Sequence, residues 1–212
     1  MPFHKTIEAI INTKIGVLSS NHLINAIDLK RYGIEKKIEK VLLYSALEFR
    51  LAIERYIFEW HFIIKYGKGF TKSDERKAGD VKEMLKAIKN NAGGFDKYER
   101  VLFFNRLWCK YSGLPQDKWT SIVDFKKLER FWAKLSDYLH MKLEEFKIEE
   151  VNLGYKLLDE VEAYLWNNLR YSSQGWVRED TLTEEMVNIR NKYIEGVISD
   201  DILDLEMKKI FK

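Results

Sequence analysis

The stretch that decides the fold is Val41–Lys65, VLLYSALEFRLAIERYIFEWHFIIK. It holds no proline or glycine, and its apolar residues recur at the spacing of a helix. We therefore predict one long helix that Gly67 and Gly69 end, since glycine adopts the left-handed conformation found after helices. A helix turns about 100° per residue, from roughly 3.6 residues per turn. Four polar residues of the stretch then fall within about 60° of one another: Arg50, Glu54, His61 and Lys65.

This polar stripe is flanked by apolar residues on both sides. Leu47, Leu51 and Phe58 lie on one flank, and isoleucines lie on the other. A guanidinium, a carboxylate and an imidazole between apolar ridges are costly to bury unless they are paired. The stripe therefore predicts a partner from another element. Two interpretations stay open: a polar cross-link that fixes how helices pack, or a functional site.

Almost every other segment also shows helical periodicity, and none shows the alternation of a strand. The expected helices span residues 4–19, 20–31, 72–91, 95–111, 124–146, 157–171, 184–195 and 200–211, with a capping box at Thr181 and Glu184. Gly33 and Gly154 are expected to interrupt helices. The predicted fold class is all-α: a bundle of about five to six helices over residues 1–150, followed by a C-terminal helical extension over residues 151–212, packed on or beside it.

Composition is typical of a folded, water-soluble protein. The chain has 212 residues, of which 46% are hydrophobic and 33% charged, and its formal net charge is +3. The single Cys109 has no partner for an intrachain disulfide, which favours a reducing, cytoplasmic location. Charged residues interrupt the most apolar segment and the N-terminal segment does not resemble a signal peptide, so we expect no membrane association.

Familiar catalytic and cofactor motifs are absent from the sequence, and the histidines and the cysteine have no metal-site spacing, so we expect no metal and no cofactor. What remains is a second helix containing Leu135–His140, LSDYLH. If it packs antiparallel to the long helix, Arg50 or Glu54 would meet His140. A neutral histidine can remove a proton near pH 7, an arginine can hold a phosphate by two hydrogen bonds, and a carboxylate can orient either. This set is suited to RNA cleavage without a metal.

The opposite side of the long helix carries Glu48, Arg55 and Glu59, and we expect Arg55 and Glu59 to form an ordinary exposed pair. His4 and His22 are expected to be structural or exposed. The lysine-rich segments at 35–37 and 124–127 are interpreted as solvated helix faces. The aromatic run Phe103–Trp108 is expected in a core.

Two segments together resemble the divergent HEPN-like helical proteins of bacteria. They are Ala46–Arg55, ALEFRLAIER, and Leu135–His140, LSDYLH. The resemblance implies a helical bundle that dimerises. It also implies either a metal-independent endoribonuclease of defence or toxin–antitoxin systems, or a binding module that has lost catalysis. Arg50, Glu54 and His140 resemble the residues of members that pair an Arg-x-x-x-Glu helix with a Leu-Ser-x-x-x-His helix. RYIFEWH, from Arg55 to His61, resembles the hallmark Arg–His spacing, although a tyrosine follows the arginine where Asn, Asp or His is usual.

The expected site follows from these residues. His140 or His61 would be the base, Arg50 the phosphate anchor and Glu54 the residue that orients them. The residues expected to bind substrate are Ser136, Tyr138, Arg55 and Lys65. The expected partners are RNA and a second copy of the chain. The alternative is a non-catalytic helical protein–protein interaction module, in which the same residues hold the core together.

Overall fold

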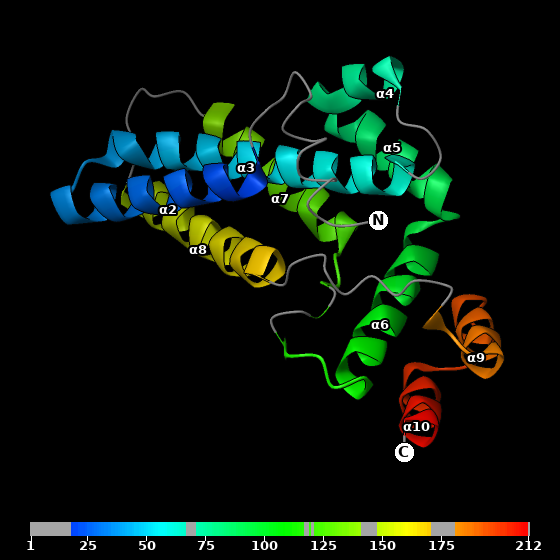
Figure 1. Ribbon diagram of the computed structural model, residues 1–212. Coiled ribbons are helices and arrows are strands. Elements are labelled where there is room, and N and C mark those ends of the chain that lie inside the picture. The colour runs from blue at the N-terminus through cyan, green and yellow to red at the C-terminus, as the bar shows by residue number, and fades with distance from the viewer. Residues whose placement is uncertain are drawn as a thin grey trace. The chain divides into compact units, whose positions relative to one another are not determined.

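The computed structural model describes residues 18–66, 71–116, 119, 121–140, 148–170 and 181–211. Every regular element within these ranges is a helix, and no strand occurs in them. The predicted all-α fold is therefore confirmed, with more helices than expected. Figure 1 shows the described helices with the labels used below.

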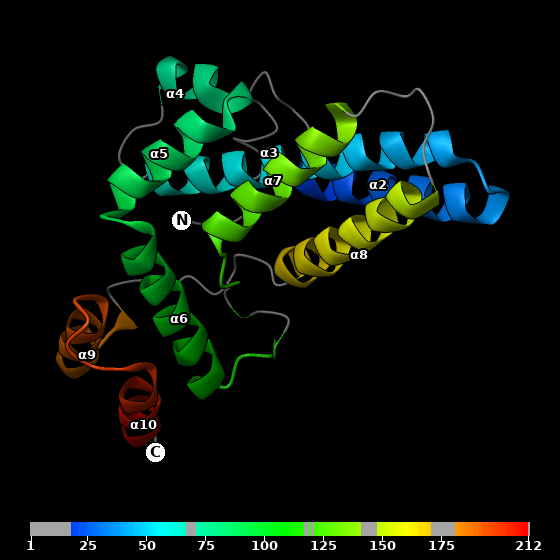
Figure 2. The same ribbon diagram turned by 180° about the vertical axis from the view of Figure 1, so that it is seen from behind.

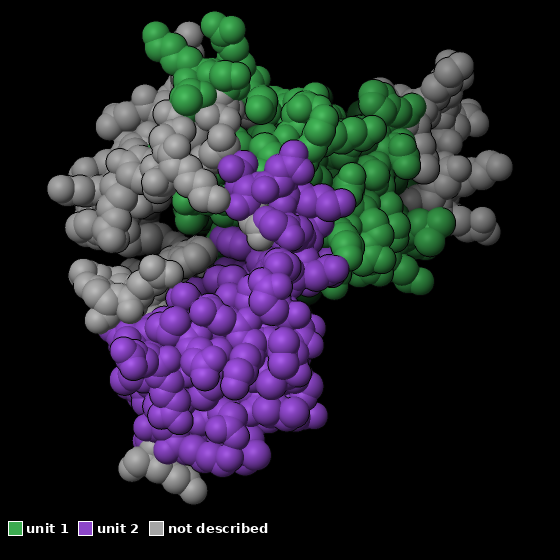
Figure 3. Space-filling view, turned by 90° about the vertical axis from the view of Figure 1, so that its right-hand side faces the viewer, with its two compact units in different colours: residues 1–88, 125–167 green, residues 89–124, 168–212 purple. Residues whose placement is uncertain are grey.

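The chain divides into two compact units, coloured separately in Figure 3. The first comprises residues 1–88 and 125–167, and the second comprises residues 89–124 and 168–212. The expected boundary between residues 150 and 151 does not coincide with this division, and it falls inside helix α8 (Ile148–Arg170). Gly154 lies inside α8 and does not interrupt it. A glycine in a helix interior costs only about 1 kcal/mol relative to alanine, which packing readily offsets.

Helices α2 (Ser19–Lys36) and α3 (Glu39–Tyr66) form an antiparallel hairpin in the first unit (Figure 1). Helix α3 contains the whole predicted stretch Val41–Lys65. The expected break at Gly33 is wrong, because Gly33 is buried within α2. A Cβ added there would lie 3.3 Å from the Cβ of Val41. The chain turns instead at Lys37, which adopts the left-handed conformation with φ of 55°.

Shorter helices come after α3 along the chain. The expected helix over 72–91 is divided into α4 (Lys72–Arg76), the 3-10 helix η1 (Lys77–Gly79) and α5 (Val81–Ala92). One apolar line of α5 is buried: Val81, Met84, Leu85 and Ile88.

Helix α7 (Phe125–His140) packs antiparallel to α3. The ring of Phe125, at the start of α7, contacts Trp60, near the end of α3, whereas Trp132 contacts Glu54 farther back along α3. Figure 2, which views the molecule from the side opposite to Figure 1, shows α7 crossing α3. The antiparallel packing on which the site prediction depends is thus present.

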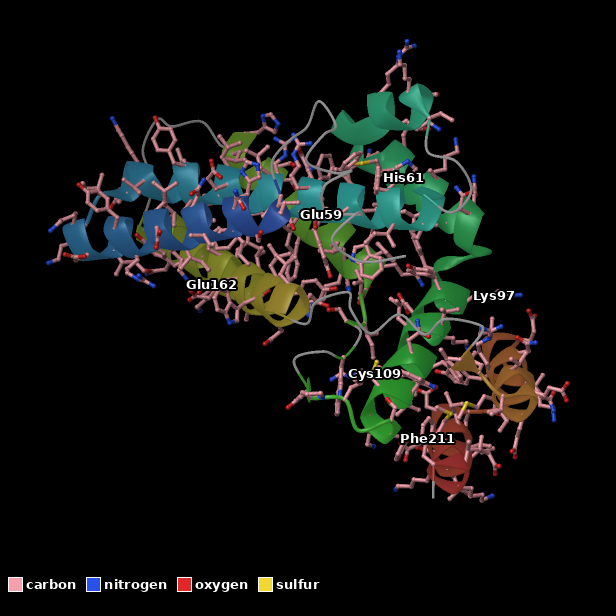
Figure 4. All side chains as sticks on the ribbon, viewed as in Figure 1. Glu59, His61, Lys97, Cys109, Glu162 and Phe211 are labelled. Carbon is pink, nitrogen blue, oxygen red and sulfur yellow. The ribbon has the colours of Figure 1, made fainter. Side chains whose placement is uncertain are left out.

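The second unit is built on α6 (Phe95–Tyr111), α9 (Glu184–Ile194) and α10 (Asp200–Ile210). Their apolar faces share one core: Phe104, Leu107, Ile189, Tyr193, Leu203 and Met207. The core interpretation of the run Phe103–Trp108 is confirmed, and Cys109 is buried in α6 beside it (Figure 4). The cap of α9 is Thr183, whose Oγ1 accepts from the backbone N–H of Met186 at 3.3 Å, and not the expected Thr181.

Candidate functional site

Arg50 and Glu54 meet a tryptophan of α7. The indole Nε1 of Trp132 donates a hydrogen bond to Glu54 Oε1 at 2.8 Å. The same carboxylate oxygen lies 3.2 Å from the buried Nε of Arg50, an ion-pair distance without hydrogen-bond alignment. The guanidinium carbon of Arg50 lies 5.3 Å from the centre of the Trp132 ring. The two helices therefore hold one arginine by charge and by an aromatic face.

Local sequence explains why these three side chains meet. Arg50 and Glu54 are four residues apart on α3, so they lie on one face. Ile53 and Ile57, beside them, are fully buried and hold that side of α3 in the core. A tryptophan in such a seam needs an acceptor for its N–H, and Glu54 supplies it.

The cluster remains partly open. The Arg50 side chain is 29% exposed and that of Glu54 is 18% exposed. The stripe was predicted to need a partner, and it has one. Sequence reasoning did not identify Trp132 as this partner. The signal available was its indole N–H, which requires an acceptor when the ring is buried.

Ser136 and His140 follow Trp132 along α7 at intervals of four residues, so the three lie on one ridge of the helix. Ser136 Oγ donates to the backbone carbonyl of Trp132 at 2.8 Å, which occupies its hydroxyl within its own helix. His140 is the last described residue of α7 and is exposed. Among the described residues, His140 makes no hydrogen bond or ion pair with Arg50 or Glu54, although such a contact was expected. His140 instead shares a ridge of α7 with Trp132, the residue that contacts both of them.

Two expected site residues are buried. His61 is fully buried on α3 (Figure 4), and Tyr138 is 4% exposed. The Tyr138 ring faces Gly154 of α8, where an added Cβ would lie 2.5 Å from its hydroxyl oxygen. A substrate does not reach His61 without displacing its neighbours. The side chain of Lys65 lies outside the described residues.

The expectation of an exposed pair between Arg55 and Glu59 is wrong. Both residues are half-buried, because α2 begins beside them. Glu59 accepts hydrogen bonds from the backbone N–H of Ser19 at 2.7 Å and from the Ser19 hydroxyl at 2.8 Å. Burial raises the pKa of Glu59 to about 7, against the opposing effects of these two hydrogen bonds and of the Arg55 charge. Burial also lowers the pKa of Arg55, while the charges of Glu54 and Glu59 oppose the shift.

His22 was expected to be either structural or exposed, and it has a structural role. Its Nδ1 lies 2.8 Å from Glu48 Oε2, which ties α2 to α3. Glu48 and Glu59 of α3 therefore both contact residues of α2, Glu48 at His22 and Glu59 at Ser19. This side of α3 is an interface with α2. His4 lies outside the described residues.

The described side chains contain no group of three or more His, Cys, Asp or Glu residues arranged to hold a metal ion. Nor does any helix within the described ranges have the length and hydrophobicity that crossing a membrane requires. The chain matches no protein-family model, no curated protein and no solved structure. The likeness to HEPN-like proteins therefore depends on the two short motifs alone.

Proposed function

We propose that this chain is a HEPN-like, metal-independent endoribonuclease in which Arg50 holds the phosphate and His140 is the general base. The observation that supports the proposal most directly is the Arg50–Glu54–Trp132 cluster. It keeps a partly exposed guanidinium in one orientation, and its Trp132 lies on the ridge of α7 that carries the exposed His140.

The chemistry requires only these side chains. Neutral His140 takes the proton of a ribose 2′-OH, and the oxygen attacks the adjacent phosphorus. Arg50 donates hydrogen bonds to the phosphate oxygens, whose charge increases in the transition state. The protonated imidazole then gives its proton to the departing 5′-oxygen, which leaves a 2′,3′-cyclic phosphate and a 5′-hydroxyl. Glu54 and Trp132 are positioning residues for Arg50. The proposal includes a homodimer and a bacterial defence or toxin–antitoxin role, which the resemblance implies.

The test is cleavage of several RNAs by the purified chain in EDTA, beside His140→Ala, Arg50→Ala and the control Arg76→Ala, which replaces an exposed arginine of α4. We expect His140→Ala to slow cleavage at least about a hundredfold, the usual contribution of a general base. The Arg76 variant should cleave normally. Circular dichroism confirms that each variant is folded. Cleavage by the His140 variant at the parent rate would overturn the proposal.

A second function is favoured by a different observation. Arg50, Glu54 and Trp132 also contact one another across two helices, and His61 is sealed in the core. These are the features of a polar cross-link in a non-catalytic interaction module. This alternative predicts no cleavage of any RNA. It also predicts that Arg50→Ala loses stability, whereas replacement of His140, exposed and outside the cluster, leaves stability within about 0.5 kcal/mol of the parent.

A further inference from the structure

A groove runs between α7 and α8 in the first unit, on the face of α7 that is turned away from Arg50. It consists of two adjoining hollows, of about 450 Å³ and about 410 Å³, which share Lys134 of α7 and Glu160 of α8. Figure 2 shows the two helices that form its walls. Large side chains separate the helices here: the rings of Phe131 and Tyr164 meet at 5.7 Å between centroids.

The first hollow is basic. Lys127, Arg130 and Lys134 line it from α7, and Glu160 is the acidic residue that lines it from α8. Arg130 and Lys134 are exposed, and the ion pairs found among the described residues do not include either of them. Since a helix rises about 1.5 Å per residue, the three cations extend over about 10 Å of α7.

The aromatic faces of this hollow are occupied by one of the cations. Lys127 Nζ lies 5.6 Å from the centre of the Phe131 ring and 4.9 Å from that of Tyr164. These cation–π contacts hold the ammonium group between the two helices. The ring faces that Lys127 covers are therefore not available for stacking of a nucleic-acid base, the usual source of affinity for single strands.

The second hollow is largely apolar. Leu153, which is 64% exposed, lines it together with Leu157, Tyr138 and Gly154. The Tyr138 ring packs directly on Gly154, where an added Cβ would lie 2.5 Å from its hydroxyl oxygen. Its charged residues balance: Lys134 and Lys156 against Asp137 and Glu160. This half has no excess of positive charge for a phosphate chain.

We propose that the α7–α8 groove binds an acidic peptide segment of a partner protein that also carries an apolar side chain. The carboxylates pair with Arg130 and Lys134, and the apolar side chain covers Leu153 and Leu157. Charge complementarity sets the position of such a peptide, and burial of the exposed leucine adds affinity. The groove is separate from Arg50 and His140, so the inference does not depend on the proposed nuclease activity.

The test begins with selection of short randomised peptides on the full-length chain, and the selected peptides are labelled with fluorescein. Binding is measured by anisotropy to the parent and to two groove variants: the charge reversal Arg130→Glu/Lys134→Glu, and Leu153→Ser. The matched control is Lys82→Glu/Lys89→Glu, which makes the same change in charge at exposed lysines of α5. We expect peptides rich in Asp and Glu with Leu, Ile or Phe. Each groove variant should weaken binding at least about tenfold, and the control less than about twofold.

Several results would overturn the inference. One is a selection that yields no binder, or binders that lack acidic residues. Another is equal binding by the groove variants and the control. A fluorescein-labelled oligouridylate that binds the parent more tightly than the peptides, and is lost in the groove variants, would assign the groove to a nucleic-acid strand. Self-association of the parent that both groove variants abolish would assign it to a second copy of this chain.

Discussion

Replacement of Glu59 by glutamine should change how stability depends on pH. The carboxylate of Glu59 has its pKa raised from 4.5 to about 7 in the folded chain, because α2 buries it at Ser19. Between these values the folded state holds a proton that the unfolded state has released. The stability contributed by this group is therefore present at low pH, is lost as pH rises from about 4.5 to 7, and is absent above that.

The size of the effect follows from the same two values. Each pKa unit corresponds to about 1.4 kcal/mol, so the difference between 4.5 and 7 gives at most about 3 kcal/mol. Glutamine is uncharged at every pH, and its carbonyl oxygen still accepts from Ser19. Glu59→Gln should therefore be more stable than the parent by about 3 kcal/mol at pH 8, and by only about 1 kcal/mol at pH 5.

The assay is urea unfolding followed by far-UV circular dichroism at several pH values between 5 and 8. The quantity of interest is the difference between variant and parent, since other titrating groups contribute equally to both. Glu83→Gln, at an exposed site on α5, is the control and should give a difference that does not vary with pH. A Glu59→Gln difference that is the same at pH 5 and pH 8 would refute the burial argument.

Three further substitutions test a close packing contact, a hydrogen bond and a strained turn. Gly154→Ala should lose about 1–3 kcal/mol through overpacking against a buried tyrosine ring; urea unfolding should show no such loss for Gly79→Ala, where an added Cβ meets nothing within 4 Å. Trp132→Phe removes the N–H donor to Glu54 and should cost about 1.5–3 kcal/mol, as for a hydrogen bond to a charged group. A double-mutant cycle with Glu54→Gln should then give a clear coupling energy, and a value near zero would contradict the contact. Lys37→Gly should raise the melting temperature, since a lysine in the left-handed conformation costs about 1–2 kcal/mol; a lower melting temperature would show that the turn is not strained.

Local patterns were sufficient for much of the fold. The long helix over Val41–Lys65 and the bounds of α6 were predicted because periodicity and glycine positions indicate them directly. The expected breaks at Gly33 and Gly154 failed for a common reason. Each glycine lies where another residue approaches closely, Val41 in one case and Tyr138 in the other. A sequence shows the glycine but not the neighbour that requires it.

The candidate site was predicted only in part, for a related reason. Charge spacing on one helix indicated that Arg50 and Glu54 needed a partner, but it did not identify Trp132, which lies far along the chain. The burial of Glu59 was missed because it depends on where α2 begins, forty residues earlier at Ser19. Contacts between distant segments decide which polar residues of a helix are exposed.

Because each compact unit is made of two separate stretches of chain, the ribosome cannot deliver either unit in one piece. Helix α6 is synthesised well before α9 and α10, which cover its Phe104 and Leu107. At about 5–20 residues per second, that face waits on the order of ten seconds for its cover. During translation the nascent chain thus presents an aromatic surface to chaperones, and a fragment ending after α8 would keep that surface exposed permanently.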